Sequence, residues 1–201
     1  AALWPGPLTL VLPRTPDCPI PPLASAGLGT IAVRAPDHRV ARTLLSAFGG
    51  PLVAPSANVS GQLSPTAAKH VERSFGDDVR MILDGGPCRV GLESTVIGCF
   101  DNAVWLLRPG GIENEAIEDL VGVRLREAMP GDSIRAPGQL QSHYAPDLPL
   151  RLNATTVAAG EALLAFGPHV PSGAATVQNL SKAANLQEAA AHLFAMLHDL
   201  D

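Results

Sequence analysis

Apolar and polar residues alternate along the first 121 residues in blocks that predict strands and helices in turn. Short apolar runs bounded by Gly or Pro predict strands within Trp4–Leu12, at Ile31–Arg34, Pro51–Ala54 and Val79–Leu83, after Gly91, and at Val104–Leu107. Apolar residues that share one helical face predict helices at Asp37–Phe48, Pro65–Phe75 and Glu113–Val121, the first of them capped by Asp37. Strands that alternate with helices predict an α/β layered fold.

The pattern changes over Met129–Pro149, which is rich in Pro, Gly, Ser and Gln and has no period. We interpret this stretch as a linker between a domain at 1–128 and a second, partial α/β domain at 150–201. Its His143-Tyr144 pair would serve either as a flap that closes over a site or as a plain anchor for the linker. The second domain is predicted to contain strands at Ala162–Phe166 and Ala174–Leu180 and a helix at Asn185–Asp199 that Asn185 caps.

A loop of small polar residues follows the apolar run at Pro51–Ala54 and contains Ser56, Asn58, Ser60 and Ser64. Ser64 is placed to cap the helix that Pro65 opens. A strand end that leads through such a loop to a helix N-terminus is a ready anion site, because free N–H groups point outward there. The alternative is a capped turn that binds no ligand.

Two arginines stand where predicted strands end, Arg34 and Arg108. The guanidinium fork suits both carboxylate and phosphate, so the pair would neutralise an acid and a nucleotide, although either side chain would also be ordinary on a surface. Glu93 is a carboxylate near the same loops, and it fits either a general base or a simple ion-pair partner.

Composition and charge narrow the function classes. The 201 residues are 46% hydrophobic and 4% aromatic, and the net charge is −5. Residues 1–110 hold nine Lys/Arg and eight Asp/Glu, whereas residues 111–201 hold five and eleven, so the first part is the better host for an anionic ligand. This balance and the scarcity of aromatics argue against a nucleic-acid platform. Three unpaired cysteines predict a reduced, cytoplasmic location, and no apolar run is long enough to span a membrane.

Familiar catalytic motifs are absent from the sequence, among them His-Glu-x-x-His, Cys-x-x-Cys, Gly-x-Ser-x-Gly and Gly-x-Gly-x-x-Gly. What remains are hydroxyl-rich loops, backbone amides and arginines. These groups suit an enzyme that positions a nucleotide and a small acid and stabilises charge between them.

Six segments, in this order, resemble the threonylcarbamoyl-AMP synthase family in its long form, which begins with a YrdC-like domain. They are Trp-Pro-Gly-Pro-Leu-Thr (4–9), Thr-Ile-Ala-Val-Arg-Ala-Pro-Asp-His (30–38), Ala-Pro-Ser-Ala-Asn-Val-Ser-Gly (54–61), Gly-Leu-Glu-Ser-Thr-Val (91–96), Leu-Arg-Pro-Gly (107–110) and Ser-His-Tyr-Ala-Pro (142–146). The resemblance implies a twisted mixed sheet with flanking helices, followed by a partial Rossmann-like domain. It also implies a reaction in which L-threonine, bicarbonate or CO2, and ATP yield threonylcarbamoyl-AMP and pyrophosphate for tRNA modification.

The resemblance implies two sets of binding residues and no catalytic nucleophile. L-Threonine would be held by Arg34, which pairs with its carboxylate, by the Ala54 backbone and by Ser94. ATP would be held by Thr30, Ser56, Asn58, Ser64, Arg108 and Tyr144. Mg²⁺ is expected with the triphosphate, without protein ligands that we name, and downstream tRNA-modification proteins are expected partners.

Two other functions share part of this pattern. One is a carbamoyl-adenylate-forming domain of hydrogenase maturation, and the other is a nucleic-acid-binding YrdC-like module. The Ser-His-Tyr-Ala-Pro segment and the domain after it favour the threonine enzyme. The family also has a basic Lys-x-Arg segment ahead of the point where this sequence starts. We therefore expect the chain to lack its N-terminal and C-terminal parts, and to be inactive or poorly folded alone.

Overall fold

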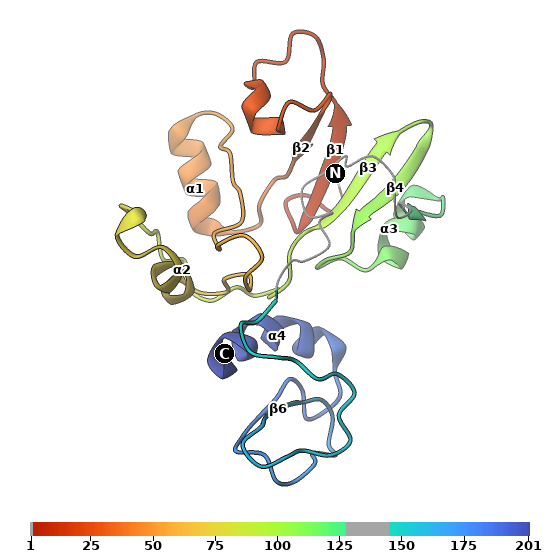
Figure 1. The fold of residues 1–201 in the computed structure, drawn as a ribbon. Coiled ribbons are helices and arrows are strands. Elements are labelled where there is room, and N and C mark those ends of the chain that lie inside the picture. Colours follow the sequence, from red (N-terminus) through yellow and green to blue (C-terminus); the bar gives the residue numbers. More distant parts are fainter. Residues whose placement is uncertain (1, 128–144) are drawn as a thin grey trace. The chain divides into compact units, whose positions relative to one another are not determined.

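The computed structural model describes residues 2–127 and 145–201 (Figure 1). By their internal contacts these residues form two compact units, each built from two segments. Unit 1 comprises residues 2–55 and 93–127, and unit 2 comprises residues 56–92 and 145–201. The division into domains at 128 and 149 stays a prediction, since the predicted linker lies largely outside the described residues.

Unit 1 is built on a mixed five-stranded sheet in the order β2-β1-β3-β4-β5 (Figure 1). β1 (Leu8–Pro13) runs antiparallel to β2 (Thr30–Val33) and parallel to β3 (Thr95–Phe100). β3 pairs antiparallel with β4 (Ala103–Arg108), which pairs parallel with the short β5 (Arg126–Glu127). This confirms the predicted α/β class with a mixed sheet.

Apolar side chains on the two faces of this sheet form two core clusters. Leu8, Ile97 and Leu106 pack with Ile117 of α3 (Asn114–Val121). The Ile117 side chain is almost completely buried. Val11, Val96 and Leu107 form the cluster on the other face. Each buried aliphatic side chain contributes roughly 1.5–3 kcal/mol, so these clusters hold the sheet and α3 together.

The first helix, α1 (Arg39–Phe48), confirms the predicted helix but corrects its cap. His38 occupies the N-cap position and makes no side-chain capping bond, so the predicted cap at Asp37 is wrong. Gly49 ends the helix in the left-handed conformation, as its lack of a Cβ allows. A short 3-10 helix, η1 (Pro22–Ser25), lies in the loop between β1 and β2.

Residues 51–83 contain the main corrections to the predicted elements. No strand is present at Pro51–Ala54 or Val79–Leu83, and Val53 is 71% exposed. Helix α2 spans Ala68–Phe75 rather than starting at Pro65, its N-cap is Ala67, and a 3-10 turn, η2 (Gly76–Asp78), follows it. Ser64 is therefore not a cap. The N–H of Thr66 instead donates to Nδ1 of His70 at 3.1 Å, so a side chain of α2 itself satisfies this turn.

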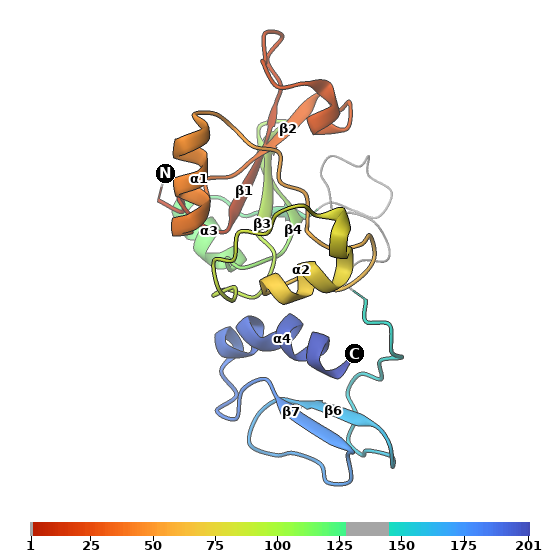
Figure 2. The same cartoon turned by 90° about the vertical axis from the view of Figure 1, so that its left-hand side faces the viewer.

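The C-terminal part of unit 2 contains parallel strands β6 (Ala162–Ala165) and β7 (Thr176–Asn179), followed by α4 (Leu186–Leu200) (Figure 2). Asn185 caps α4 by accepting a hydrogen bond from the N–H of Glu188 at 2.9 Å, as predicted. Gly91 lets the α4 backbone approach closely, because a Cβ at this position would overlap the main chain at Ala191.

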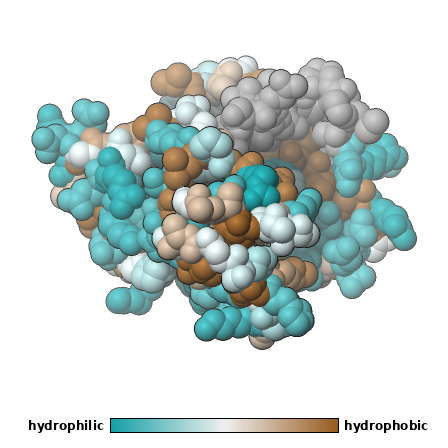
Figure 3. All heavy atoms as spheres, turned by 60° about the horizontal axis from the view of Figure 1, so that its bottom comes forward, coloured by the Kyte–Doolittle hydropathy of each residue, from teal (hydrophilic) through white to brown (hydrophobic). Residues whose placement is uncertain are grey.

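Unit 2 leaves several large apolar side chains exposed. Figure 3 shows hydrophobic residues among hydrophilic ones on the face that lies at the bottom of Figure 1. The exposed apolar residues of the C-terminal segment include Leu148, Leu150, Leu152, Val177 and Leu186. Among the described residues, no helix is both long and apolar enough to cross a membrane.

Candidate functional site

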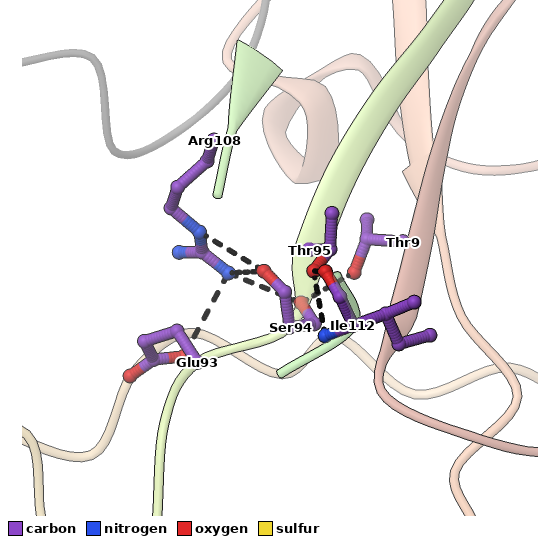
Figure 4. A network of polar contacts seen from close by, with 6 residues as sticks. All are labelled: Thr9, Glu93, Ser94, Thr95, Arg108 and Ile112. Carbon is purple, nitrogen blue, oxygen red and sulfur yellow. Dashed lines mark hydrogen bonds and ion pairs between the residues drawn. The ribbon is translucent and has the colours of Figure 1, made fainter. Parts of the chain in front are cut away.

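The polar network of unit 1 centres on Arg108, the last residue of β4, and on Ser94, which directly precedes β3 (Figure 4). The Arg108 guanidinium donates from Nε and Nη2 to the Ser94 carbonyl oxygen at 3.2 and 2.8 Å, and from Nη2 to Ser94 Oγ at 3.0 Å. The Glu93 carboxylate lies 3.8 Å from the same Nη2. Glu93 is thus an ion-pair partner, which was one of its two predicted roles.

Two threonines fasten this network to the sheet. Thr9 of β1 places Oγ1 2.7 Å from Ser94 Oγ (Figure 4). Thr95 is fully buried, and its hydroxyl donates to the Ile112 carbonyl at 2.8 Å and accepts from the Ile112 N–H at 2.9 Å. The Gly111 N–H donates to the Glu93 carbonyl at 2.8 Å. The loop that carries Ser94 is therefore held from both sides.

Arg34 follows β2 directly, as its predicted place at a strand end requires, and its side chain is exposed. It lines an open pocket of about 390 Å³ together with a second arginine, Arg42 of α1. The other lining residues are Pro5, Ala35, Pro36 and Leu45. Two arginine residues at one pocket favour a small anion there, since the guanidinium group binds carboxylate and phosphate. Thr30 begins β2, and Ala54 lies in an exposed loop.

The remaining described candidates belong to unit 2. Asn58 closes a turn by donating from Nδ2 to the carbonyls of Val59 and Gln62, both at 3.0 Å. Its Oδ1 atom is buried and has no partner among the described residues. Ser56 is exposed, whereas Ser64 is buried and its carbonyl accepts a 3.0 Å bond from His198 Nε2. A buried, unpartnered amide oxygen is costly, so Oδ1 is a ready acceptor for a ligand donor.

His70 on α2 has a strongly shifted pKa, and its ring stacks on that of His198 of α4 with ring centroids 3.9 Å apart. Burial, together with smaller electrostatic effects of His198, Lys69 and Arg73, lowers the pKa of His70 from 6.5 to about 4, against an opposing effect of Asp199. His70 is therefore neutral near pH 7. Because its Nδ1 accepts from Thr66, the proton of the neutral ring is on Nε2.

The structure brings some predicted residues together and leaves others apart. Ser94 and Arg108, predicted for different substrates, contact each other directly. Thr30 and Arg34 lie at opposite ends of β2. Tyr144 lies outside the described residues. The described residues contain no group of three His, Cys, Asp or Glu that would hold a metal ion.

Sequence reasoning missed Thr9 and Thr95. Both lie inside quoted segments, Thr9 ending Trp-Pro-Gly-Pro-Leu-Thr and Thr95 following Ser94, but nothing in the spacing assigns them partners. A threonine in a strand is ordinary, since β-branched residues favour strands. Only the register, which pairs Leu8 with Thr95 and Val96 with Arg108, brings these side chains to one place.

Two family models match the chain in succession. Residues 1–110 match the Sua5/YciO/YrdC model, described as "Telomere recombination", and residues 112–201 match the model "Threonylcarbamoyl-AMP synthase, C-terminal domain". The first model alone covers more than half of the chain.

Characterised relatives and solved structures agree with these matches. The chain is 45% identical over 152 residues to threonylcarbamoyl-AMP synthase of Bacillus subtilis, which covers 74% of this chain and 44% of that protein. It is 46% identical over 147 residues to threonylcarbamoyl-AMP synthase of Pyrococcus abyssi, which covers 71% of this chain and 43% of that protein. The chain therefore spans less than half the length of these two relatives.

Two solved structures match nearly the whole chain. P. abyssi Sua5 complexed with L-threonine superposes with a TM-score of 0.81 at 34% identity, over 98% of this chain and 62% of that chain. A P. abyssi Sua5 variant, in which a consecutive histidine and tyrosine are replaced by alanine, superposes with a TM-score of 0.77 at 33% identity. By its matching models, its relatives and its fold, this chain belongs to the Sua5/YciO/YrdC family and continues into the C-terminal domain of the threonylcarbamoyl-AMP synthases.

Proposed function

We propose that this chain is the part of an L-threonylcarbamoyladenylate synthase that binds L-threonine and ATP and joins them through CO2. The observation that carries this proposal is the match to a Sua5 structure complexed with L-threonine, over 98% of the chain at 34% identity. The B. subtilis and P. abyssi relatives both carry the name threonylcarbamoyl-AMP synthase, which supports this reading over the hydrogenase-maturation and nucleic-acid alternatives.

In the proposed reaction the amine of L-threonine adds to CO2 and loses a proton, which gives a carbamate. A carbamate oxygen then attacks the α-phosphorus of ATP, a new P–O bond forms, and the bond to the departing pyrophosphate breaks. Such a transfer needs in-line positioning and neutralised phosphates rather than a covalent enzyme nucleophile. The available arginines and hydroxyl groups supply these functions.

We assign the threonine carboxylate to Arg34, which lines a pocket together with Arg42. Ser94 and the Ala54 backbone complete the threonine set, and Arg108 belongs to the ATP set. The contact between Ser94 and Arg108 supports this assignment. It joins a residue assigned to bind L-threonine to a residue assigned to bind ATP, and the two substrates must meet for the reaction. Charge-assisted bonds of this kind are worth roughly 1.5–3 kcal/mol each.

We also assign ATP to Thr30, Ser56, Asn58, Ser64 and Tyr144. The unpartnered Oδ1 of Asn58 supports its place in that set. The P. abyssi Sua5 variant with alanine at a consecutive histidine and tyrosine supports testing the His143-Tyr144 pair here. Mg²⁺ would come with the triphosphate, and no described residue is assigned to it. We further propose a cytoplasmic location, supported by three free cysteines.

Pyrophosphate release from ATP and bicarbonate, with and without L-threonine, tests the proposal. The assay compares the chain as printed with a longer version that carries a Lys-x-Arg segment, taken from a relative, ahead of residue 1. We expect threonine-dependent release from the longer version and little from the chain alone, because the basic segment supplies phosphate contacts. If neither folded protein releases pyrophosphate or binds L-threonine in calorimetry, the proposed function is wrong.

A further inference from the structure

Ser94 Oγ lies between two hydrogen-bonding side chains from different strands. Thr9 Oγ1 of β1 is 2.7 Å away, and Arg108 Nη2 of β4 is 3.0 Å away (Figure 4). Ser94 is only 8% exposed, so its hydroxyl has little freedom to seek other partners. The direction of its single proton is set by these neighbours.

An inventory of protons shows what the Ser94 hydroxyl has left to offer. A serine hydroxyl has one proton and two lone pairs, and a guanidinium only donates. Arg108 therefore takes one lone pair of Ser94 Oγ. If Thr9 donates to the second lone pair, the Ser94 proton is free for a ligand oxygen. In the opposite arrangement the Thr9 proton needs an acceptor, and no other hydrogen bond of the Thr9 hydroxyl is found among the described residues.

The donor and acceptor groups point to the same kind of ligand atom. Arg108 Nη2, which is paired with the Glu93 carboxylate at 3.8 Å, already donates to Ser94 Oγ at 3.0 Å. A Ser94 hydroxyl that donates its proton outward matches an oxygen acceptor and not an ammonium group, which only donates. Among the groups of L-threonine, only the carboxylate is anionic before CO2 adds to the amine. The Ser94 hydroxyl, donating outward, matches that group.

The sheet register places Thr9 between the two residues assigned to L-threonine. β1 lies between β2 and β3 in the sheet. Leu10 pairs with Val33, so Thr9 and Arg34 are the next residues along the two strands. On the other side Leu8 pairs with Thr95, which Ser94 precedes. Thr9 therefore lies on the strand between Arg34 and Ser94, the two residues whose side chains would bind the carboxylate of L-threonine.

We propose that Thr9 is a positioning residue: its hydroxyl donates to Ser94 Oγ and so fixes the Ser94 proton toward the carboxylate of bound L-threonine. This inference rests on the proposed function and adds a specificity residue to the same site. Thr9 itself touches no reacting atom and acts through Ser94.

The test compares variants of Thr9 in L-threonine binding by calorimetry without bicarbonate, on the same folded protein as in the assay above. Thr9→Val removes the hydroxyl and keeps the branched shape, and we expect a roughly tenfold higher Kd for L-threonine. Thr9→Ser keeps the hydroxyl and should stay within about threefold of the wild type. In turnover, Thr9→Val should raise the KM for L-threonine and leave kcat and the KM for ATP nearly unchanged.

A double-mutant cycle separates positioning from structure. In a Ser94→Ala background, Thr9→Val should change the Kd by less than about threefold, because its effect passes through the Ser94 hydroxyl. An equal loss in both backgrounds, or wild-type affinity in Thr9→Val, overturns the inference. Thr9→Ala provides a second hydroxyl-free variant if Thr9→Val does not fold. If the wild-type protein binds no L-threonine, the proposed function fails as well, whereas binding that ignores Thr9 defeats this inference alone.

Discussion

Gly110 shows how a single residue without a side chain sets the geometry around Ser94. A Cβ at this position would lie 2.5 Å from both the Ser94 carbonyl carbon and the Thr95 nitrogen, so the backbone would have to move. Overpacking of this kind costs about 1–3 kcal/mol. We expect Gly110→Ala to lower the free energy of unfolding of unit 1 by that amount and to weaken L-threonine binding.

The matched control is Gly29→Ala, because a Cβ at Gly29 meets no atom within 4 Å. Both variants are compared in urea unfolding followed by tryptophan fluorescence, which reports on unit 1 since Trp4 and Trp105 both belong to it. Equal stability of the two alanine variants would contradict the close approach at Gly110.

At single residues the sequence predicted position rather than role. Arg34 and Arg108 lie at strand ends as predicted, but their binding roles stay predictions. Thr9 was not predictable, because its partner is 85 residues away in the sequence. The roles of Ser94 and Ala54 came from the family resemblance, not from their residue types, and these roles stay predictions.

At the scale of elements, periodicity succeeded where an element has a tertiary partner. The apolar runs that became β1, β3 and β4 pair with one another and bury residues such as Val11 and Ile97. The Pro51–Ala54 run, which begins with one proline and is followed by another, forms no strand and pairs with no described strand. A hydrophobic pattern therefore shows that a run could form a strand, and the presence of a neighbouring strand decides whether it does.

The helix pair α2 and α4 carries a pH dependence that follows from His70. Its pKa of about 4 in the folded chain is below the ordinary value of 6.5, so between these values the unfolded chain binds more protons. Stability of this helix pair is therefore constant above about pH 6.5 and falls as the pH drops toward 4. From the two pKa values the loss approaches about 3 kcal/mol as an upper bound.

The variant His70→Asn tests this dependence, because an asparagine oxygen can take the place of Nδ1 as acceptor for Thr66 and does not titrate. We expect hydrogen exchange of α2 and α4 amides to speed up between pH 6.5 and 4, beyond the intrinsic pH effect, in the wild type and not in His70→Asn. His169→Asn, at an exposed histidine of the same unit, should behave as the wild type. If hydrogen exchange of these amides depends on pH in the same way in all three proteins, His70 does not cause the loss of stability.

At the scale of the whole molecule, the predicted α/β class is confirmed, whereas the predicted domain boundaries at 128 and 149 stay a prediction. The two family models match consecutive stretches of the sequence and meet near residue 111. Unit 2, by contrast, combines residues 56–92 with 145–201. Composition and periodicity describe neighbours in sequence, and a unit made of two distant segments is set by contacts such as those of His198 with Ser64 and His70.

Ligand binding provides a prediction for the stability of the whole chain. A ligand that binds only the folded state at 100 times its Kd stabilises that state by about 2.7 kcal/mol. We expect L-threonine to do so here. Arg34→Gln should weaken binding by about ten- to a hundredfold through loss of the charged bond, which leaves between about 0.4 and 1.4 kcal/mol at the same concentration.

Arg42→Gln is the matched control for this measurement, because Arg42 lines the same pocket and carries the same charge. If Arg34 alone binds the carboxylate, Arg42→Gln keeps nearly the full threonine-induced shift in thermal unfolding. An equal loss in both variants would mean that the positive potential of the pocket, rather than one guanidinium, attracts the ligand. If Arg34→Gln keeps the full threonine-induced shift in thermal unfolding, the carboxylate of L-threonine does not bind at the end of β2. The comparison thus decides between a geometric and a purely electrostatic basis for recognition, because the two arginines differ in position and not in charge.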